Sequence, residues 1–262
     1  RRLSRGEGYL ASCILHQVIM DIKLLSLLDG ARSAVGTAVI IDVYRAFTTA
    51  AVAFQRGVDE ILLVAEIEDA LALRESGRGD LCVGEVDGKR PDGFDYNNSP
   101  FAMSEADIAD KRLILSTRAG TVGVEAASNA SEIYVASLMT AAATAAVIRD
   151  DSPDVVSVVA MGWATLVRTD EDEQCGLYIR NLLQGASPDP QHVASLVASA
   201  SESQKFDDPA KPHFHLKDRE IALRIDSAQF AIKVLREEGL LIGKPIYTAE
   251  ERRSRGEEGN HI

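Results

Sequence analysis

Short apolar runs alternate with longer amphipathic runs along most of this chain, and this alternation limits the fold more than any other feature. The short runs are rich in branched residues, as buried strands are, and lie at 38–43, 60–65, 81–85, 111–117, 132–137 and 154–162. Helices are expected between them, at 48–57, 67–76, 120–128, 138–150 and 170–185. Buried strands that alternate with helices predict a three-layer α/β/α sandwich with a mixed, mostly parallel sheet.

The last part of the chain predicts two further helices and a hairpin. The helices are expected in PDPQHVASLVASASES and KDREIALRID, and FAIKVLREEGLLIGKP predicts two strands that turn at 237–239. No linker or repeat interrupts the pattern, so we expect one domain at 20–247. The basic residues 1–19 then form an N-terminal extension, and 248–262 form a charged C-terminal tail.

Composition excludes several function classes. The formal net charge of −12 argues against a nucleic-acid-binding protein, and no stretch is apolar for long enough to predict a membrane span. The three cysteines have neither zinc-site nor disulfide spacing, which favours the reducing cytoplasm. Small α/β enzymes often form dimers, so a homodimer is one candidate assembly. An acidic chain that binds an anion needs a local cluster of donors.

Polar residues gather where the predicted strands end. Asp42 ends one strand, Glu85 ends another, the segment 117–121 follows a third, and 171–172 lies a short loop beyond a fourth. Ligands of α/β proteins bind at the carboxyl ends of strands. If these strands are parallel neighbours, all four groups face one crevice.

Each of these residues also has a purely structural interpretation. Asp42 could cap the next helix or pair with Arg45, and Thr48 and Thr49 suit helix N-caps. Thr169 with Asp172 fits a capping box. Glu85 could be a turn residue and Arg118 a surface residue. His213 and His215, with no acid nearby, are more typical of a loop than of a metal site.

The combination favours chemistry on a phosphate. Carboxylates at strand ends suit Mg²⁺, while arginines and the amides at helix starts suit anions. Acids for a metal together with arginines for an anion are what a metal-assisted phosphate-ester hydrolase needs. The chain has no P-loop and no G-x-G-x-x-G after a strand. IIDVY resembles the nucleophile strand of haloacid-dehalogenase phosphatases, but Tyr44 stands where those carry a second aspartate.

Four segments resemble the 2-phosphosulfolactate phosphatase family. They are DVYRAFTT (42–49), GEVDGKRPDGFDYNNSP (84–100), TRAGT (117–121) and EDEQCGLYIRNLLQG (171–185), in the order of the family. The resemblance implies a three-layer sandwich and Mg²⁺-dependent hydrolysis of 2-phosphosulfolactate to sulfolactate and phosphate, a step in coenzyme M synthesis. The expected partner is a small anionic phosphate ester.

The resemblance also implies roles for individual residues. Asp42, Glu85 and Asp172 are the expected catalytic residues, and Asp42, Glu85 and Glu171 the expected Mg²⁺ ligands. The remaining site residues are expected to bind substrate and are Arg45, Thr48, Thr49, Asn98, Ser99, Arg118, Gly120 and Thr121.

The chain departs from the family pattern in two places. Arg118 and Ala119 replace a threonine and an asparagine, and Tyr44 and Phe47 are bulkier than is usual there. These departures lie beside the expected anion site and are consistent with a different phosphorylated acid as substrate. Two alternatives stay open, a non-catalytic anion binder and a phosphoryl transferase that uses the same metal site.

Overall fold

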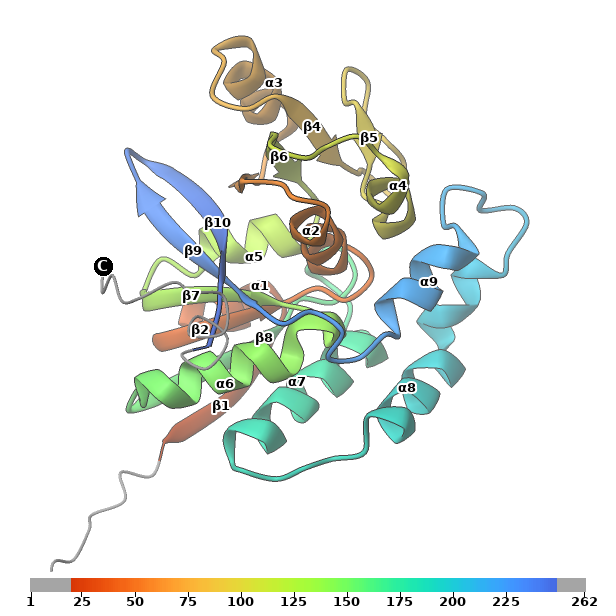
Figure 1. Cartoon of the computed structure of the whole chain (residues 1–262). Helices are drawn as coiled ribbons and strands as arrows, with labels where there is room; N and C mark the ends of the chain where they lie inside the picture. Colours follow the sequence, from red (N-terminus) through yellow and green to blue (C-terminus); the bar gives the residue numbers. More distant parts are fainter. Residues whose placement is uncertain (1–19, 249–262) are drawn as a thin grey trace, which may run out of the picture.

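One ten-stranded mixed sheet organises the computed structural model, which describes residues 20–248 (Figure 1). The predictions for 1–19 and for nearly all of 248–262 lie outside the described residues. The strands are β1 (Asp21–Ser26), β2 (Gly36–Ile41), β3 (Glu60–Val64), β4 (Leu81–Gly84), β5 (Tyr96–Asn97), β6 (Arg112–Ser116), β7 (Ala130–Ala136), β8 (Val155–Ala160), β9 (Ala231–Glu237) and β10 (Leu240–Ile246). Their order is β1-β8-β2-β7-β9-β10-β3-β6-β4-β5.

Two parallel blocks make up the sheet, and the hairpin β9–β10 joins them. β1, β8, β2 and β7 pair in parallel, and so do β3, β6, β4 and β5. The pairings β7–β9, β9–β10 and β10–β3 are antiparallel. Three reversals separate the blocks, so the two blocks run in opposite directions within the sheet. The condition set for one shared crevice, that all site-bearing strands are parallel neighbours, is therefore not met, although the mixed sheet is confirmed.

The predicted hairpin is confirmed with its turn. Glu238 and Gly239 have φ values of 50° and 80°. Two successive positive φ angles characterise the tight hairpin turn whose twist matches that of the flanking strands. The C-terminal residues therefore supply the central strands of the sheet, where they connect its two halves.

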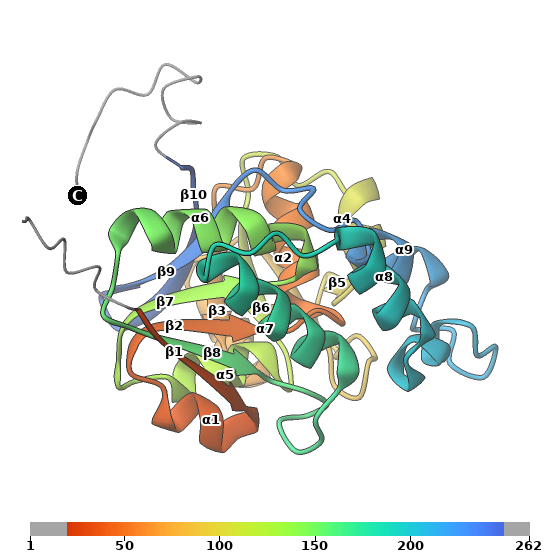
Figure 2. The same cartoon turned by 90° about the horizontal axis from the view of Figure 1, so that it is seen from below.

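Helices cover both faces of the sheet (Figure 2). Helices α1 (Leu27–Ser33), α2 (Ala46–Gln55) and α5 (Gly120–Ala126) contribute to one core cluster. On the opposite face, α6 (Ala141–Asp151) and α7 (Asp170–Leu183) pack on the first block, and α3 (Ile67–Glu75) packs on the second. The residues of β2 alternate between the two faces. Ala38 and Ile40 belong to the first cluster, whereas Val39 and Ile41 belong to the second. A strand buried on both faces explains the continuous apolar run.

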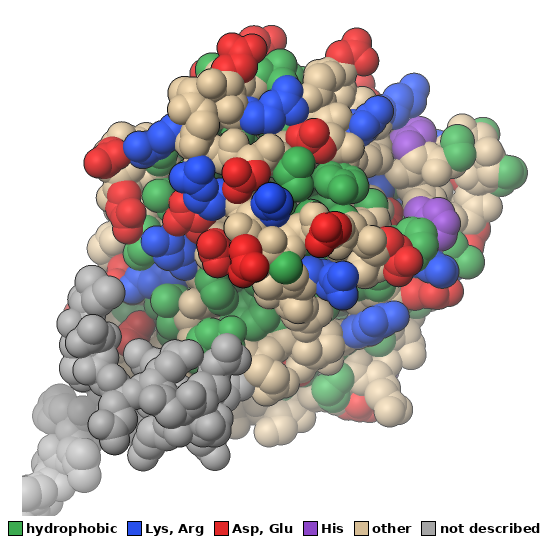
Figure 3. Space-filling model, turned by 45° about the horizontal axis from the view of Figure 1, so that its top comes forward, with side chains coloured by type: hydrophobic (Ala, Val, Ile, Leu, Met, Phe, Trp, Pro, Cys, Tyr) green, Lys and Arg blue, Asp and Glu red, His purple; other side chains and the backbone are tan. Residues whose placement is uncertain are grey.

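The remaining helices lie beside the strand ends that carry the polar residues (Figure 1). They are α4 (Pro100–Glu105), α8 (Pro190–Ser199), the short 3₁₀ helices η1 (Leu138–Thr140) and η2 (Ser201–Phe206), and α9 (Leu216–Ala222). The structure confirms α8 and α9, which proline and periodicity predicted. On the face drawn in Figure 3, acidic and basic side chains are interspersed. Within residues 20–248 no helix combines the length and apolar composition that a membrane crossing requires.

Candidate active site

Asp42 follows β2 directly and lies in the wall of a pocket. The residue is 6% exposed. Oδ1 accepts a 3.0 Å hydrogen bond from the backbone N–H of Ala46, and Oδ2 accepts a 2.9 Å bond from that of Gly120. Ala46 begins α2 and Gly120 begins α5. One carboxylate therefore holds two helix starts together, and the predicted capping role is part of its function.

Burial raises the pKa of Asp42 from 3.8 to about 6. The N–H groups of Ala46 and Gly120 oppose that shift, while the negative charge of Glu85 adds to it and the positive charge of Lys205 lowers it. A carboxyl group with a pKa near 6 changes protonation state close to neutral pH, as acid–base catalysts do.

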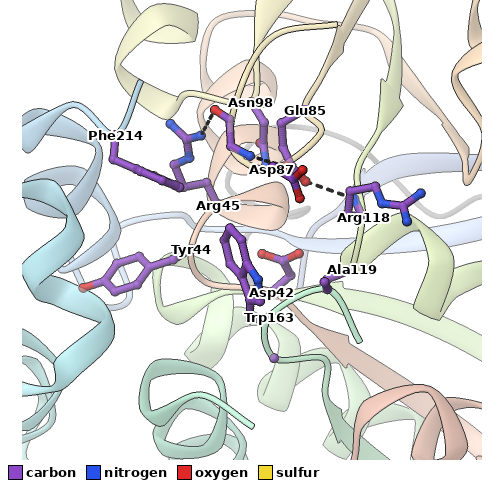
Figure 4. Close-up of a pocket in the computed structure, with 13 residues that line it drawn as sticks. Asp42, Tyr44, Arg45, Glu85, Asp87, Asn98, Arg118, Ala119, Trp163 and Phe214 are labelled. Carbon is purple, nitrogen blue, oxygen red and sulfur yellow. Dashed lines mark hydrogen bonds between the residues drawn. The ribbon is translucent and has the colours of Figure 1, made fainter. Parts of the chain in front are cut away.

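Glu85 reaches the same pocket from the end of β4, in the other half of the sheet. Oε2 accepts a 2.7 Å hydrogen bond from the N–H of Gly88, and Oε1 a 3.0 Å bond from that of Arg118. In Figure 4 the carboxylates of Asp42 and Glu85 point into one space, whereas the guanidinium of Arg118 points away from it. The structure thus brings together two of the three acids that were expected to bind the metal, even though their strands are not parallel neighbours.

Arg45 lines this pocket, but most of its donors have protein partners. Nη1 donates to Asp218 Oδ2 at 2.8 Å and to the carbonyl of His213 at 2.9 Å, and Nη2 donates to the carbonyl of Gly88 at 3.1 Å. The guanidinium also lies 4.8 Å from the ring centroid of Phe214. Arg45 pairs with Asp218 rather than with Asp42, and its contacts tie the strand end to two loops.

The threonines of α2 act within the protein interior. Thr48 Oγ1 donates to the carbonyl of Val43 at 2.7 Å, and Thr49 Oγ1 donates to Asn98 Oδ1 at 2.7 Å. Neither threonine caps the helix, so that structural alternative is not observed. Neither threonine lines the pocket, but Asn98 does. The hydrogen bond from Thr49 fixes the orientation of the Asn98 amide.

Ser99 and Thr121 are also bonded inside the protein. The hydroxyl of Ser99 donates to Asp218 Oδ1 at 2.6 Å and accepts from the N–H of Ala102, which caps α4. Thr121 Oγ1 donates to the carbonyl of Thr117 at 2.9 Å. Both hydroxyls shape the loops behind the pocket and do not line it.

Asp172 is a buried cross-link between two strand ends. Oδ1 accepts from the N–H of Val43 at 2.7 Å, and Oδ2 accepts from that of Gly162 at 2.8 Å. The carboxylate therefore does not form the capping box predicted with Thr169, whose hydroxyl has no hydrogen-bond partner in the structure. Asp172 does not line the pocket, and its contacts position the loops that carry Asp42 and Gly162.

Glu171 is buried beside this cross-link. Its Oε2 atom has no hydrogen-bond partner. Burial raises the pKa of its carboxyl from 4.5 to about 7, and the positive charge of Lys205 opposes the shift. Glu171 does not line the pocket of Asp42 and Glu85.

The carboxylates offer a partial site for Mg²⁺. Across residues 20–248 no three His, Cys, Asp or Glu side chains converge in a metal-binding cluster, so Asp42, Glu85 and Glu171 do not form the expected set. Asp42 and Glu85 do share a pocket. Each of their four oxygens accepts one N–H and keeps a further lone pair. Mg²⁺ often binds through one or two carboxylates and retains several waters, so this pair fits the ion.

The sequence did not predict several of the residues at the site. Trp163 and Phe214 line the pocket, and Lys205 lies 5.1 Å and 5.0 Å from their ring centroids. They come from the loop after β8 and from the segment 201–215. No motif marks these positions, and only the fold brings them to the strand ends.

A strand-end pocket lined by the carboxylates of Asp42, Glu85 and Asp87 is the kind of place where α/β proteins bind small polar ligands. The sequence model of the family described as 2-phosphosulpholactate phosphatase matches residues 25–226. The chain belongs to this family of phosphoric monoester hydrolases.

Relatives support this assignment. A probable 2-phosphosulfolactate phosphatase of Bacillus subtilis (strain 168) is 31% identical over 199 residues, which cover 75% of this chain and 86% of that protein. Proteins with the same description from Parasynechococcus marenigrum and Deinococcus radiodurans are 37% and 34% identical. Those alignments cover 48% and 56% of this chain, and 53% and 61% of the two relatives.

Proposed function

We propose that this chain is a Mg²⁺-dependent phosphatase that hydrolyses 2-phosphosulfolactate, or a similar small phosphorylated acid, to sulfolactate and phosphate. The observation that carries the proposal is the pair Asp42 and Glu85, which reaches one pocket from opposite halves of the sheet. Both carboxylates are held by backbone N–H groups, so their positions do not depend on flexible side chains. The names of the relatives support the substrate.

Asp42 and Glu85 would hold the ion, with water completing its coordination. Bound Mg²⁺ supplies charge neutralisation on a phosphoryl oxygen and lowers the pKa of a bound water. Asp42 is the residue that we assign to accept a proton from attacking water, because its carboxylate lies in the pocket beside Glu85 and each of its oxygens keeps a lone pair. Asp172 keeps the Asp42 loop in place, and Trp163 lines the pocket.

The test is phosphate release from three esters, 2-phosphosulfolactate, 2-phospholactate and isopropyl phosphate, with Mg²⁺ and with EDTA. We expect turnover of the first two with Mg²⁺ and its loss in EDTA. Equal turnover in both conditions would contradict the metal role, and no turnover of any ester would contradict the phosphatase function.

Two other functions remain distinguishable. A non-catalytic binder would bind sulfolactate in calorimetry and release no phosphate. A phosphoryl transferase would form a new ester when an alcohol or nucleotide is added. The altered TRAGT segment gives little support to the binder, because Arg118 contributes its backbone N–H to Glu85 and its side chain points away.

If 2-phosphosulfolactate is the substrate, the reaction is a step of coenzyme M synthesis in the cytoplasm. Deletion of the gene is then expected to lower cellular sulfolactate, and fractionation is expected to place the chain with cytoplasmic markers. Unchanged sulfolactate in the deletion strain would argue for another phosphorylated acid.

A further inference from the structure

Lys205 is a buried cation beside the candidate active site. It lies in η2, and its side chain is 8% exposed. Its Nζ atom is within 5.0–5.7 Å of four aromatic ring centroids, which belong to Tyr44, Trp163, Phe206 and Phe214. Contacts between an ammonium group and aromatic faces stabilise the charge without neutralising it. A lysine held in this way keeps its charge available to a ligand.

The ammonium group has donors to spare. Among residues 20–248 only Glu202 supplies it with an acceptor, Oε2 at 3.0 Å, and the side chain of Glu202 is 32% exposed. An ammonium carries three N–H donors. Both cations are ion-paired, but the partner of Lys205 is the partly exposed Glu202, whereas the partner of Arg45 is the fully buried Asp218, so solvent screens the counter-charge of Lys205 more strongly. Lys205 is therefore better placed than Arg45 to offer positive charge to an anion.

The available space leads from the two carboxylates toward Lys205. The pocket of Asp42 and Glu85 is small, with a volume of about 30 Å³, so a whole substrate molecule does not fit inside it. Asp87, Trp163 and Phe214 also line an adjoining open groove of about 780 Å³, and Lys205 lines that groove as well. A substrate whose phosphoryl group enters the small pocket must place the rest of its atoms in the groove.

We propose that Lys205 binds the second anionic group of the substrate, its carboxylate or sulfonate, while the phosphoryl group lies at Asp42 and Glu85. The assignment rests on the proposed phosphatase function. It makes the enzyme selective for phosphate esters that carry an acid on the neighbouring carbons. The aromatic side chains exclude water around the charge, which strengthens its attraction for an anion.

The experiment compares the wild type with Lys205→Met and Lys205→Arg on the same three esters. Methionine fills the aromatic surroundings without charge. We expect Lys205→Met to raise KM for 2-phosphosulfolactate about 10- to 100-fold, the effect of one lost charge-assisted hydrogen bond. The kcat/KM for isopropyl phosphate, which has no acid group, should fall much less than that for 2-phosphosulfolactate, and Lys205→Arg should retain part of the selectivity.

The control is Lys217→Met. This lysine also lies over an aromatic ring, that of Phe101 at 4.3 Å, but does not line the groove. The substitution Lys217→Met should leave KM and kcat for all three esters unchanged. If Lys205→Met also raises KM for 2-phospholactate, Lys205 binds the carboxylate. If it raises KM for 2-phosphosulfolactate alone, Lys205 binds the sulfonate. An equal fall in kcat/KM for isopropyl phosphate, or an unchanged kcat/KM for all three esters, would overturn the proposal.

Calorimetry with sulfolactate separates this proposal from the phosphatase function. If the wild type hydrolyses no ester, the phosphatase function fails, but weaker sulfolactate binding by Lys205→Met would still support the anion site. Equal affinity of wild type and variant, or no binding by either, would overturn the assignment of Lys205.

Discussion

Arg45 and Asp218 form an ion pair with 2.8 Å between Nη1 and Oδ2, although 173 positions separate them in the sequence. The two side chains are 1% and 0% exposed. Asp218 also accepts hydrogen bonds from the hydroxyl of Ser99 and the N–H of Phe101. The pair thus fixes α9 and the start of α4 against the loop that carries Asp42.

Asp218→Asn is expected to destabilise the protein by about 3–5 kcal/mol, because it leaves the guanidinium of Arg45 buried without a counter-charge. Urea unfolding measures the change. The double variant Arg45→Met/Asp218→Asn should cost less than the sum of the single variants, since it removes both charges. Additive costs, or a loss below about 1 kcal/mol for Asp218→Asn, would mean that the pair is not coupled.

Asp42→Asn should lower kcat/KM at least about 100-fold, the usual contribution of a positioned acid–base group. The amide would also place an NH₂ group against the N–H of Ala46 or Gly120, at a cost of about 1–3 kcal/mol. Phosphate release and urea unfolding separate the two effects. Asp92→Asn, on the exposed part of the loop after β4, is the matched control and should behave as the wild type.

Glu85→Gln should raise the Mg²⁺ concentration needed for half-maximal activity about 10- to 100-fold, because one of two carboxylate ligands is lost. A Mg²⁺ titration of activity after removal of metal with EDTA measures this. The same half-saturating concentration in wild type and variant would show that Glu85 does not bind the ion.

Gly120→Ala tests how closely the α5 start approaches Asp42. A Cβ atom at this position would lie 2.9 Å from Asp42 Oδ2 and 2.9 Å from the Cβ of Ala46. We expect a loss of about 1–3 kcal/mol of stability and a weakened N–H bond to Asp42, with at least tenfold lower activity. Gly176→Ala is the control, since its nearest contacts are at 3.5 Å and 3.6 Å in the middle of α7. It should gain up to about 1 kcal/mol from helix propensity.

Glu171 should make stability depend on pH. Burial raises the pKa of this carboxyl from 4.5 to about 7, so the folded state favours the neutral form. The stabilisation that this form provides is complete below pH 4.5 and is lost as the pH rises through about 7. Glu171→Gln should flatten the change in unfolding free energy over that window, by about 3 kcal/mol. An unchanged pH profile would show that Glu171 titrates near its ordinary pKa.

The residues that the sequence places at strand ends are the ones that hold the site together. Asp42 and Glu85 could be found because each ends an apolar run, and this pattern depends only on neighbours along the chain. The hairpin turn at Glu238 and Gly239 could also be predicted, because it separates two apolar runs that are neighbours in the sequence. Asp172 was predicted to be catalytic, but it lies behind the pocket, and its bonds to the loops after β2 and β8 required the folded sheet.

The sequence by itself determined the type and order of most elements, because hydrophobic period and turn chemistry are local properties. Only the tertiary structure decided that two parallel blocks run in opposite directions, that Arg45 is neutralised by Asp218, and that Lys205 lies among aromatic rings beside Asp42. These relationships join residues that are far apart in the chain. They are set by how the whole sheet packs, and no short segment carries that information.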